Sequence, residues 1–235
     1  MLSLTPTAAR SRDEASPAPR SSDRVAAYIA EGLIDGRLVP GQRLIEADIM
    51  KALGVSRGPV REGLTRLEGQ GVVALTPHRG AHVRALSREE ASDLMIVLEA
   101  LTALSARFAA ASVRDEAVQP AQGRDLATLE GFCNVDAPEN MLIGRRRDFY
   151  AALLRVGGNR QLPRIMPVMS VHVLRAQAQP FWTAADRQNI VAEYAAVAQA
   201  VLNGDPPAAE RTMRRHIRQA MRRIRALPDE AFPLT

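Results

Sequence analysis

The segment from Ala47 to Glu68 constrains the fold most, because its pattern predicts two short helices joined by a tight turn. Gly54 lies where the first helix would end, and glycine tolerates the positive φ that such an end requires. Ser56 is placed to cap the second helix, and Pro59 falls in its first turn, where a missing N–H costs little. The segment therefore predicts a helix-turn-helix.

The second of these helices would carry two different faces. Val60, Leu64 and Leu67 recur at the i, i+4, i+7 spacing, which predicts a face turned toward the core. Arg57 and Arg61 lie four residues apart on another face, near the N-terminal end. A helix that packs one face on the core and carries two arginines near its N-terminus is suited to contact bases in the DNA major groove. An ordinary helical hairpin with solvated arginines gives the same short pattern.

A small β-hairpin is predicted directly after this helix. The β-prone runs 72–76 and 81–84 flank a turn that contains Gly80. The tip of the hairpin carries His78 and Arg79. A helix-turn-helix followed at once by a hairpin with a basic tip predicts a winged helix.

The residues upstream complete this unit. Apolar spacing predicts a supporting helix over 23–34, which closes at Gly36. The winged-helix unit is therefore expected to cover 22–85. Residues 1–21 are rich in Ser, Pro, Ala and Arg and lack the apolar core of a secretory signal, so we expect a disordered N-terminal arm.

The same stretch resembles a known family. The segments 36–44, 53–64, 66–68 and 79–81 are similar to the DNA-binding domain of the GntR superfamily of bacterial transcription regulators. The resemblance implies a homodimer that binds a palindromic double-stranded DNA operator, with each recognition helix in a major groove and each wing tip in the neighbouring minor groove. Carried over by position, the implied DNA contacts are Ser56, Arg57, Arg61, His78, Arg79 and Gly80. Gly63 stands where the family more often has alanine, which lowers helix propensity but blocks no contact.

The composition suits a cytoplasmic protein with a polyanionic partner. The chain of 235 residues has room for one small and one medium domain, and its formal net charge is +5. Such an excess favours a partner like DNA. Cys133 is the only cysteine, which excludes an internal disulfide and suits a reducing cytosol. The most apolar run, 94–106, contains Glu99 and is too short to span a bilayer, so no membrane partner is expected.

Beyond residue 86 the pattern predicts helices throughout. Ser87 and Glu90 form a capping box at the start of a long helix that reaches about Ser112. Further helices are predicted over 119–133, 137–156, 159–178, 183–203 and 205–226. The predicted fold is mainly α: an N-terminal winged helix-turn-helix domain, an all-helical bundle of six to seven helices over 86–228, and a C-terminal tail over 229–235.

The predicted bundle resembles the effector-binding domain, of the FCD type, in the FadR-like subgroup of the same superfamily. The resemblance is carried by 93–94, 106–110, 148–149, 158–159 and 203–205, and by 213–217 near the end. It implies a bundle that binds a small metabolite at its centre, often a carboxylate. Binding would then change the spacing of the two DNA-binding domains of the dimer.

Many members of this subgroup hold a divalent metal with one aspartate and three histidines. Carried over residue by residue, those positions are Arg146, Tyr150, Tyr194 and His216. Only His216 is a usable ligand, because arginine is cationic and neutral tyrosine is a poor ligand for zinc-like ions. We therefore expect no metal. Leu98 and Thr102 stand where many members have an arginine and a glutamate, so the pocket would be less polar.

Without a metal, the side chains at these positions become the candidates for holding an effector. Tyr150, Tyr194 and His216 would form a hydrogen-bonding floor, and Arg146 would pair with a carboxylate in bidentate fashion. His172 and Arg175 are further candidates for the same cavity. Each candidate also has a plainer explanation. The tyrosines would pack in the core, the arginines would lie on a solvated face, and His216 would be a core histidine whose hydrogen bonds are satisfied. Most arginines of 211–225 are expected on a solvated outer face.

Three classes of function are to be distinguished for such a chain. The first is a DNA-binding transcriptional regulator, expected to be a repressor, whose operator affinity is controlled by a small organic effector. The second is an enzyme, which is not expected because the sequence shows no Ser/His/Asp grouping, metal cluster or phosphate loop. The third, which stays open as the alternative, is a constitutive DNA-binding protein whose helical domain only dimerises.

Overall fold

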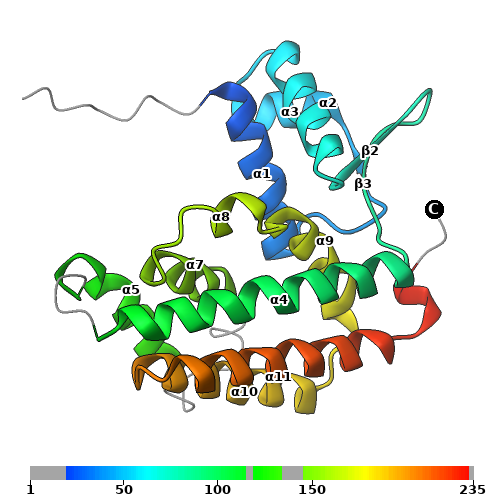
Figure 1. Ribbon diagram of the computed structural model, residues 1–235. Coiled ribbons are helices and arrows are strands. Elements are labelled where there is room, and N and C mark those ends of the chain that lie inside the picture. Colours follow the sequence, from blue (N-terminus) through cyan, green and yellow to red (C-terminus); the bar gives the residue numbers. More distant parts are fainter. Residues whose placement is uncertain (1–19, 115–118, 134–144, 233–235) are drawn as a thin grey trace, which may run out of the picture.

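A computed structural model describes residues 20–114, 119–133 and 145–232 of the chain. Figure 1 shows the N-terminal elements, α1 to β3, on one side of a bundle that the later helices form. The predicted fold class, mainly α with an N-terminal winged helix-turn-helix, is confirmed. Most of the predicted N-terminal arm and the first part of the helix predicted over 137–156 lie outside the described residues.

The N-terminal elements pack around one small core. They are α1 (Ser21–Asp35), β1 (Arg43–Leu44), α2 (Glu46–Leu53), α3 (Arg57–Gly69), β2 (Val73–Thr76) and β3 (Gly80–Val83). The predicted core positions Val60, Leu64 and Leu67 are buried. Helix α2 ends at Gly54, which has a φ of 63°. Ser56 occupies the N-cap position of α3, but its side chain makes no capping hydrogen bond.

The wing is a hairpin with a third strand beside it. Strands β2 and β3 are antiparallel, with Thr76 opposite Gly80, so the predicted hairpin is present with its second strand starting one residue early. Strand β1 pairs with the other edge of β3, with Arg43 opposite His82, which gives the order β1-β3-β2. The sequence did not predict β1, because two residues are too few to show an alternating pattern.

Gly63 allows α1 and α3 to approach each other closely. A Cβ at this position would lie 2.7 Å from the Cβ of Val25 and 3.1 Å from the carbonyl oxygen of Ser22. The expectation that this glycine only lowers helix propensity was therefore incomplete. Its missing side chain is also what lets the two helices pack at this distance.

In the described part of the chain, the bundle consists of helices of 4 to 25 residues. They are α4 (Arg88–Ser112), α5 (Gln119–Cys133), α7 (Arg146–Val156), α8 (Leu162–Ile165), α9 (Val168–Ala178), α10 (Ala184–Leu202) and α11 (Pro206–Arg225), with 3-10 turns at Gln179–Phe181 and Asp229–Ala231. Helices α4 and α11 run side by side (Figure 1). The predicted capping box is present: Ser87 Oγ accepts from the Glu90 N–H at 3.1 Å, and the Glu90 carboxylate accepts from the Ser87 N–H at 2.9 Å.

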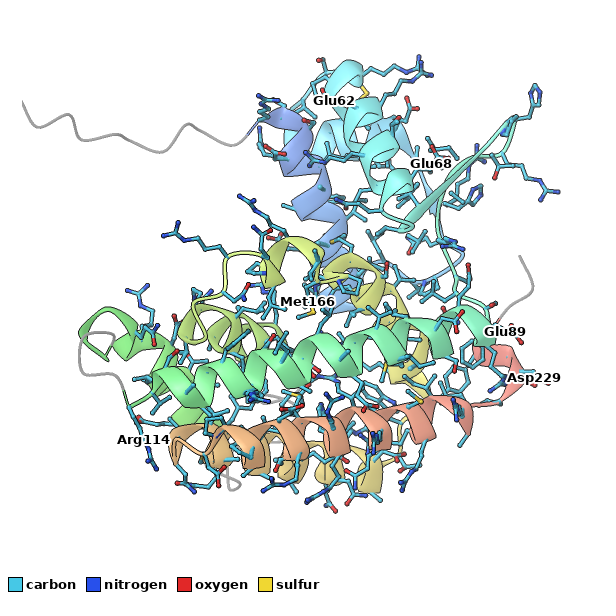
Figure 2. The ribbon with its side chains drawn as sticks, viewed as in Figure 1. Glu62, Glu68, Glu89, Arg114, Met166 and Asp229 are labelled. Carbon is cyan, nitrogen blue, oxygen red and sulfur yellow. The ribbon has the colours of Figure 1, made fainter. Side chains whose placement is uncertain are left out.

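One predicted helix is interrupted in the structure, so this prediction was wrong. The segment predicted as a single helix over 159–178 is broken into α8 and α9. Met166, labelled in Figure 2, lies at the break in an extended conformation, with φ −65° and ψ 124°. Pro167 explains the break, because a proline disfavours the helical conformation for the residue before it.

Helix α4 corrects the expectation about membrane spans. With its 25 residues it is long and apolar enough, by length and composition, to cross a membrane, so the statement that its apolar run is too short was wrong. In the fold it packs against α11, α7 and α10. Ala103, Ala106 and Ala109 are fully buried, and Glu99 forms ion pairs with arginines of α11. A core helix of the bundle accounts for this composition.

The last described residues fold back onto the start of α4. The Arg88 guanidinium donates to the carbonyl oxygens of Arg225 and Leu227, both at 3.0 Å, and lies 4.5 Å from the centre of the Phe232 ring. Phe232 itself is buried. This part of the segment predicted as a tail is therefore attached to the bundle.

Helix α9 connects the bundle with the N-terminal elements. The Gln177 side chain accepts from the Leu86 N–H at 3.0 Å and donates to the Leu86 carbonyl oxygen at 2.8 Å. At the other end of α9, Ser170 Oγ donates to the Gln70 carbonyl oxygen at 3.4 Å, just after α3. Helix α1 also packs against α9 (Figure 1). A single helix thus contacts both the segment that follows the wing and the helix-turn-helix.

Candidate functional site

The leading end of α3 presents the two predicted DNA-contacting arginines to solvent. The side chains of Arg57 and Arg61 are 65% and 62% exposed. Both are oriented by one carboxylate: Glu46, in the first turn of α2, accepts from Arg57 Nε at 2.8 Å and from Arg61 Nε at 3.3 Å. The hydrogen bond from Arg57 is the main cause that lowers the pKa of Glu46. Exposed pairs of this kind contribute little to stability, so a DNA phosphate or base can replace the carboxylate.

Sequence reasoning missed Glu46. It precedes Arg57 and Arg61 on a different helix, so no helical spacing links the three residues. Only the angle between α2 and α3 brings them together. Ser56 is exposed beside them, at the N-cap of α3.

The wing tip is the second predicted DNA contact. His78, Arg79 and Gly80 are all exposed, and Figure 2 shows the hairpin and its side chains projecting away from α1, α2 and α3. His78 and Gly80 both have positive φ, of 64° and 81°. A positive φ is uncommon for a residue with a side chain, although histidine is among those that adopt it more often. The turn thus holds the basic side chains of the tip at the end of the β2–β3 hairpin.

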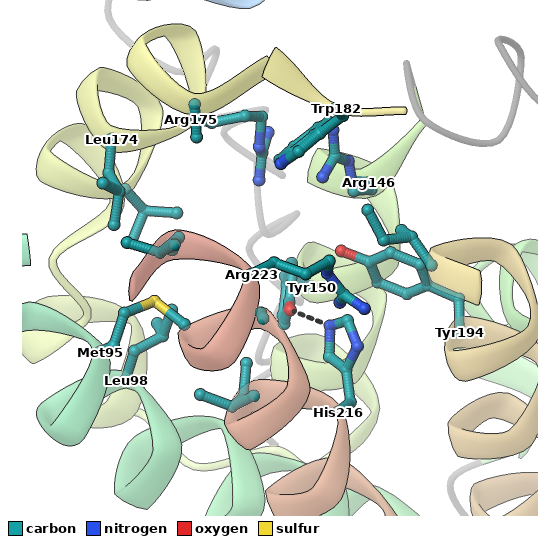
Figure 3. Close-up of a pocket in the computed structure, with 16 residues that line it drawn as sticks. Met95, Leu98, Arg146, Tyr150, Leu174, Arg175, Trp182, Tyr194, His216 and Arg223 are labelled. Atoms are coloured by element: carbon teal, nitrogen blue, oxygen red, sulfur yellow. Dashed lines mark hydrogen bonds between the residues drawn. The ribbon is translucent and has the colours of Figure 1, made fainter. Parts of the chain in front are cut away.

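The predicted effector residues converge on a cavity at the centre of the bundle (Figure 3). The cavity has a volume of about 80 Å³, and helices α4, α7, α9, α10 and α11 all contribute to its wall. It is lined by five of the six predicted residues, Arg146, Tyr150, Arg175, Tyr194 and His216. His172, the sixth, lines an adjoining cavity instead.

A chain of hydrogen bonds forms one side of this cavity. The Tyr150 hydroxyl lies 3.2 Å from His216 Nε2, and His216 Nδ1 lies 2.7 Å from a Glu193 oxygen. Arg223 donates to both Glu193 oxygens, at 2.7 and 2.8 Å. Nδ1 therefore carries the proton and donates to the carboxylate, while Nε2 accepts from Tyr150.

The ionisation of these groups follows from their burial. Burial lowers the pKa of the His216 imidazole, against the opposing effect of Glu193, and raises the pKa of the Tyr150 hydroxyl well above its usual value. Burial also disfavours the charged form of Glu193, but the hydrogen bonds from Arg223 and His216 outweigh it and lower the pKa of this carboxyl. The carboxylate and Arg223 are thus charged and neutralise each other, while His216 and Tyr150 are neutral.

Arg223 and Glu193 are site residues that the sequence analysis did not identify. Most arginines of the last helix were expected on a solvated outer face, yet the Arg223 side chain is only 15% exposed. A signal was present, because Arg223 lies seven residues after His216 and therefore on the same face of α11.

Arg146 supplies a buried positive charge to the cavity. The residue is 5% exposed, whereas the side chain of its neighbour Arg147 is 56% exposed, so the solvated-face explanation is wrong for Arg146. Its guanidinium carbon lies 4.7 Å from the centre of the Trp182 ring. Burial, and then the charge of Arg175, lower the pKa of Arg146 to about 10, so it stays protonated at neutral pH.

The adjoining cavity is larger and mostly apolar. Its volume is about 130 Å³, and it shares Leu98, Tyr150, Val171 and Arg175 with the first cavity as a common wall. Thr102 lines it too, but its hydroxyl donates to the Leu98 carbonyl oxygen at 2.7 Å and so adds little polarity. Glu99 instead pairs with Arg214 and Arg218 of α11. Leu98 and Thr102 therefore contribute to the cavity walls, whereas the Glu99 carboxylate does not.

The residues at the family's metal-ligand positions do not fit a divalent metal. They do come together, since the Tyr194 and His216 rings lie 4.7 Å apart between centres. Both nitrogens of His216 are already used, however, and Arg146 brings a positive charge to the same cavity. Within the described ranges no three residues of the types His, Cys, Asp and Glu form a group that could hold a metal ion.

Comparison with known proteins gives the following matches. Residues 21–83 match the family described as "Bacterial regulatory proteins, gntR family", and residues 93–219 match the FCD domain. An "Uncharacterized HTH-type transcriptional regulator in unstable DNA locus" from Streptomyces ambofaciens is 31% identical over 206 residues, which are 83% of this chain and 82% of that protein. A "Probable D-xylose utilization operon transcriptional repressor" from Paenarthrobacter nicotinovorans is 24% identical, over 83% of this chain and 85% of that protein.

A solved structure shows the same fold. The structure of McbR/YncC from E. coli covers 88% of this chain and 98% of its own, with a TM-score of 0.74 and 17% sequence identity.

Proposed function

Because the chain belongs to the gntR family of bacterial regulatory proteins and carries an FCD domain, we propose that it is a repressor whose operator affinity is controlled by a small carboxylate bound in the bundle. Members of this family regulate transcription and are not enzymes. The observation that carries the effector part is the central cavity, where Arg146 and Arg175 place two cations among buried side chains. A carboxylate there would be desolvated and held by charge-assisted hydrogen bonds.

In the DNA-binding part of the proposal, the protein acts in the cytoplasm as a homodimer on a palindromic operator. Arg57 and Arg61 contact bases or phosphates of the major groove, Ser56 holds the backbone, and the tip formed by 78–80 enters the minor groove. The exposure of both arginines and their shared, replaceable partner Glu46 support this assignment. The repressor role is supported by the relative from Paenarthrobacter nicotinovorans, which is described as a probable transcriptional repressor.

The DNA part is tested by fluorescence anisotropy on an operator selected from random DNA. Arg57→Ala and Arg61→Ala should each weaken specific binding by about 1–3 kcal/mol, because a good contact to a base edge is worth that much. Arg211→Ala is the matched control, since Arg211 is an exposed arginine on α11, in the bundle. Unchanged operator affinity in both α3 variants would contradict the assigned role.

The effector part is tested by titrating carboxylates into the protein–operator complex. A binding carboxylate should raise the melting temperature of the protein and release it from the operator, and Arg175→Met should abolish both effects while leaving operator affinity intact. If no carboxylate changes either quantity, the constitutive DNA-binding protein is the better description. In transcription in vitro, the protein should lower output from a promoter that contains the operator; a rise would contradict the repressor role.

A further inference from the structure

The two adjoining cavities indicate what kind of carboxylate the protein binds. Resting on the proposed function, we infer that the effector is a monocarboxylate with an apolar, ring-sized group, its carboxylate on Arg146 and Arg175 and its ring in the adjoining cavity.

The charge inventory of the central cavity favours a single carboxylate. No aspartate or glutamate is among the described residues that line it. Three arginines line it: Arg223 forms an ion pair with Glu193, and Arg146 and Arg175 are the other two. Figure 3 shows these two side chains entering it from α7 and α9, near Trp182. One anionic group in this cavity lowers the mutual repulsion of the two arginines, and a second carboxylate beside it would have to displace Glu193 from Arg223. The adjoining cavity has one further arginine in its lining, Arg147, whose side chain is 56% exposed and pairs with Asp148 at 3.8 Å.

The adjoining cavity suits an apolar group of about six carbons. Ala151, Leu154, Met166 and Val168 line it together with the residues of the shared wall. Its volume of about 130 Å³ is close to that of an apolar cavity of roughly 150 Å³ that takes up benzene in another protein. A ring attached to the carboxylate through one or two carbons would extend past the wall formed by Tyr150 and Arg175.

His172 provides an independent sign that this cavity takes a ligand. The residue is 5% exposed, and its Nδ1 has no hydrogen-bond partner among the described residues. Burial lowers the pKa of the imidazole to about 4, so it is neutral and offers a donor or acceptor, depending on the tautomer. A buried polar atom without a partner is costly, and a polar substituent on the ring would satisfy it.

The test compares the full-length protein with phenylacetate, acetate and succinate by isothermal titration calorimetry. Phenylacetate should bind about 100-fold more tightly than acetate, because the ring leaves water for an apolar cavity. Succinate should bind no better than acetate. Benzyl alcohol, which has the ring without the charge, should bind far more weakly than phenylacetate. Ring hydroxylation that reaches His172 should strengthen binding, and His172→Leu should cancel that gain.

Two substitutions locate the ring. Ala151→Phe should fill the adjoining cavity and reduce phenylacetate affinity to that of acetate, with acetate affinity unchanged. Val168→Trp, at a 42% exposed lining position, fills the same cavity from its rim and provides a second test if Ala151→Phe fails to fold. Ala127→Phe, at an exposed alanine of α5, is the matched control.

The outcomes separate this inference from the proposed function. If acetate and succinate bind as tightly as phenylacetate, or if both filled variants bind phenylacetate normally, the ring-sized group is wrong while carboxylate control stands. If no carboxylate binds at all, the effector part of the proposed function fails, and this inference fails with it.

Discussion

Replacing Gly63 with alanine, the residue more often found there in the family, should destabilise the N-terminal domain. The added Cβ would lie 2.7 Å from Val25 Cβ and 2.8 Å from Val25 Cγ1. Carbon atoms pack at roughly 3.5–4.0 Å, so α1 and α3 would have to separate by on the order of 1 Å. A rotamer change cannot relieve the contact, because the nearest atom is a Cβ and the carbonyl oxygen of Ser22 is 3.1 Å away.

The size of the effect follows from two opposing contributions. Overpacking of this kind costs about 1–3 kcal/mol, while glycine to alanine in a helix gains about 1 kcal/mol in propensity. Gly69→Ala is the matched control, since Gly69 belongs to the same helix and a Cβ there meets nothing within 4 Å. Gly69 is the last residue of α3, so its propensity gain is at most that of Gly63, and Gly63→Ala should be less stable than Gly69→Ala by up to about 3 kcal/mol.

Hydrogen exchange of the α1 and α3 amides is the suitable measurement, because it reports on this domain separately from the bundle. The protection of these amides should fall in Gly63→Ala and be kept or raised in Gly69→Ala. Equal protection in the two variants would refute the claim that Gly63 is needed for the close approach of α1 and α3.

Three further predictions follow from the site. Glu46→Gln should raise non-specific DNA affinity, measured by anisotropy on random-sequence duplexes, because it removes the carboxylate that competes with phosphates for Arg57 and Arg61; unchanged affinity would show that Glu46 does not compete. The pKa of His172 is about 4 in the fold against 6.5 ordinarily, so the unfolded chain binds more protons in this range, and stability should fall by about 3 kcal/mol as the pH drops from 6.5 to 4. In the His172→Phe variant, the melting temperature should depend less on pH over this range. An equally steep pH dependence in the variant would count against a neutral buried imidazole. Zinc or nickel added to the chelator-treated protein should leave its melting temperature unchanged, and a metal-dependent rise would overturn the conclusion that these residues do not fit a metal.

Local signals in the sequence predicted the elements well. Gly54 ends α2, and Ser87 with Glu90 starts α4, because caps depend on residues next to one another in the chain. The break between α8 and α9 was not predicted, although Pro167 is present in the sequence. Apolar residues both before and after this proline suggested one continuous helix. Strand β1 is defined by its pairing with β3 and has no pattern of its own.

The candidate site was predicted as a set of positions but not as a network. Five of the predicted side chains do line one cavity. A family resemblance can predict such positions, because the order of the helices determines which of them face the centre of the bundle. The pairing of Arg223 with Glu193 depends on the contact between α10 and α11, and that of Glu46 with Arg57 on the contact between α2 and α3. In a sequence rich in arginine, the contact with Glu193 distinguishes Arg223, which is 15% exposed, from arginines such as Arg57 that stay exposed to solvent.

The position of α9 imposes a thermodynamic condition on any signal between effector and DNA. Arg175 lines the cavity, and Gln177, two residues later on the same short helix, holds Leu86 in the segment that follows the wing. A displacement of α9 at one of these points is therefore also a displacement at the other. Occupancy of the cavity changes operator affinity only as far as ligand and DNA prefer different positions of α9. The coupling is reciprocal, so if an effector weakens operator binding by some factor, operator DNA weakens effector binding by the same factor.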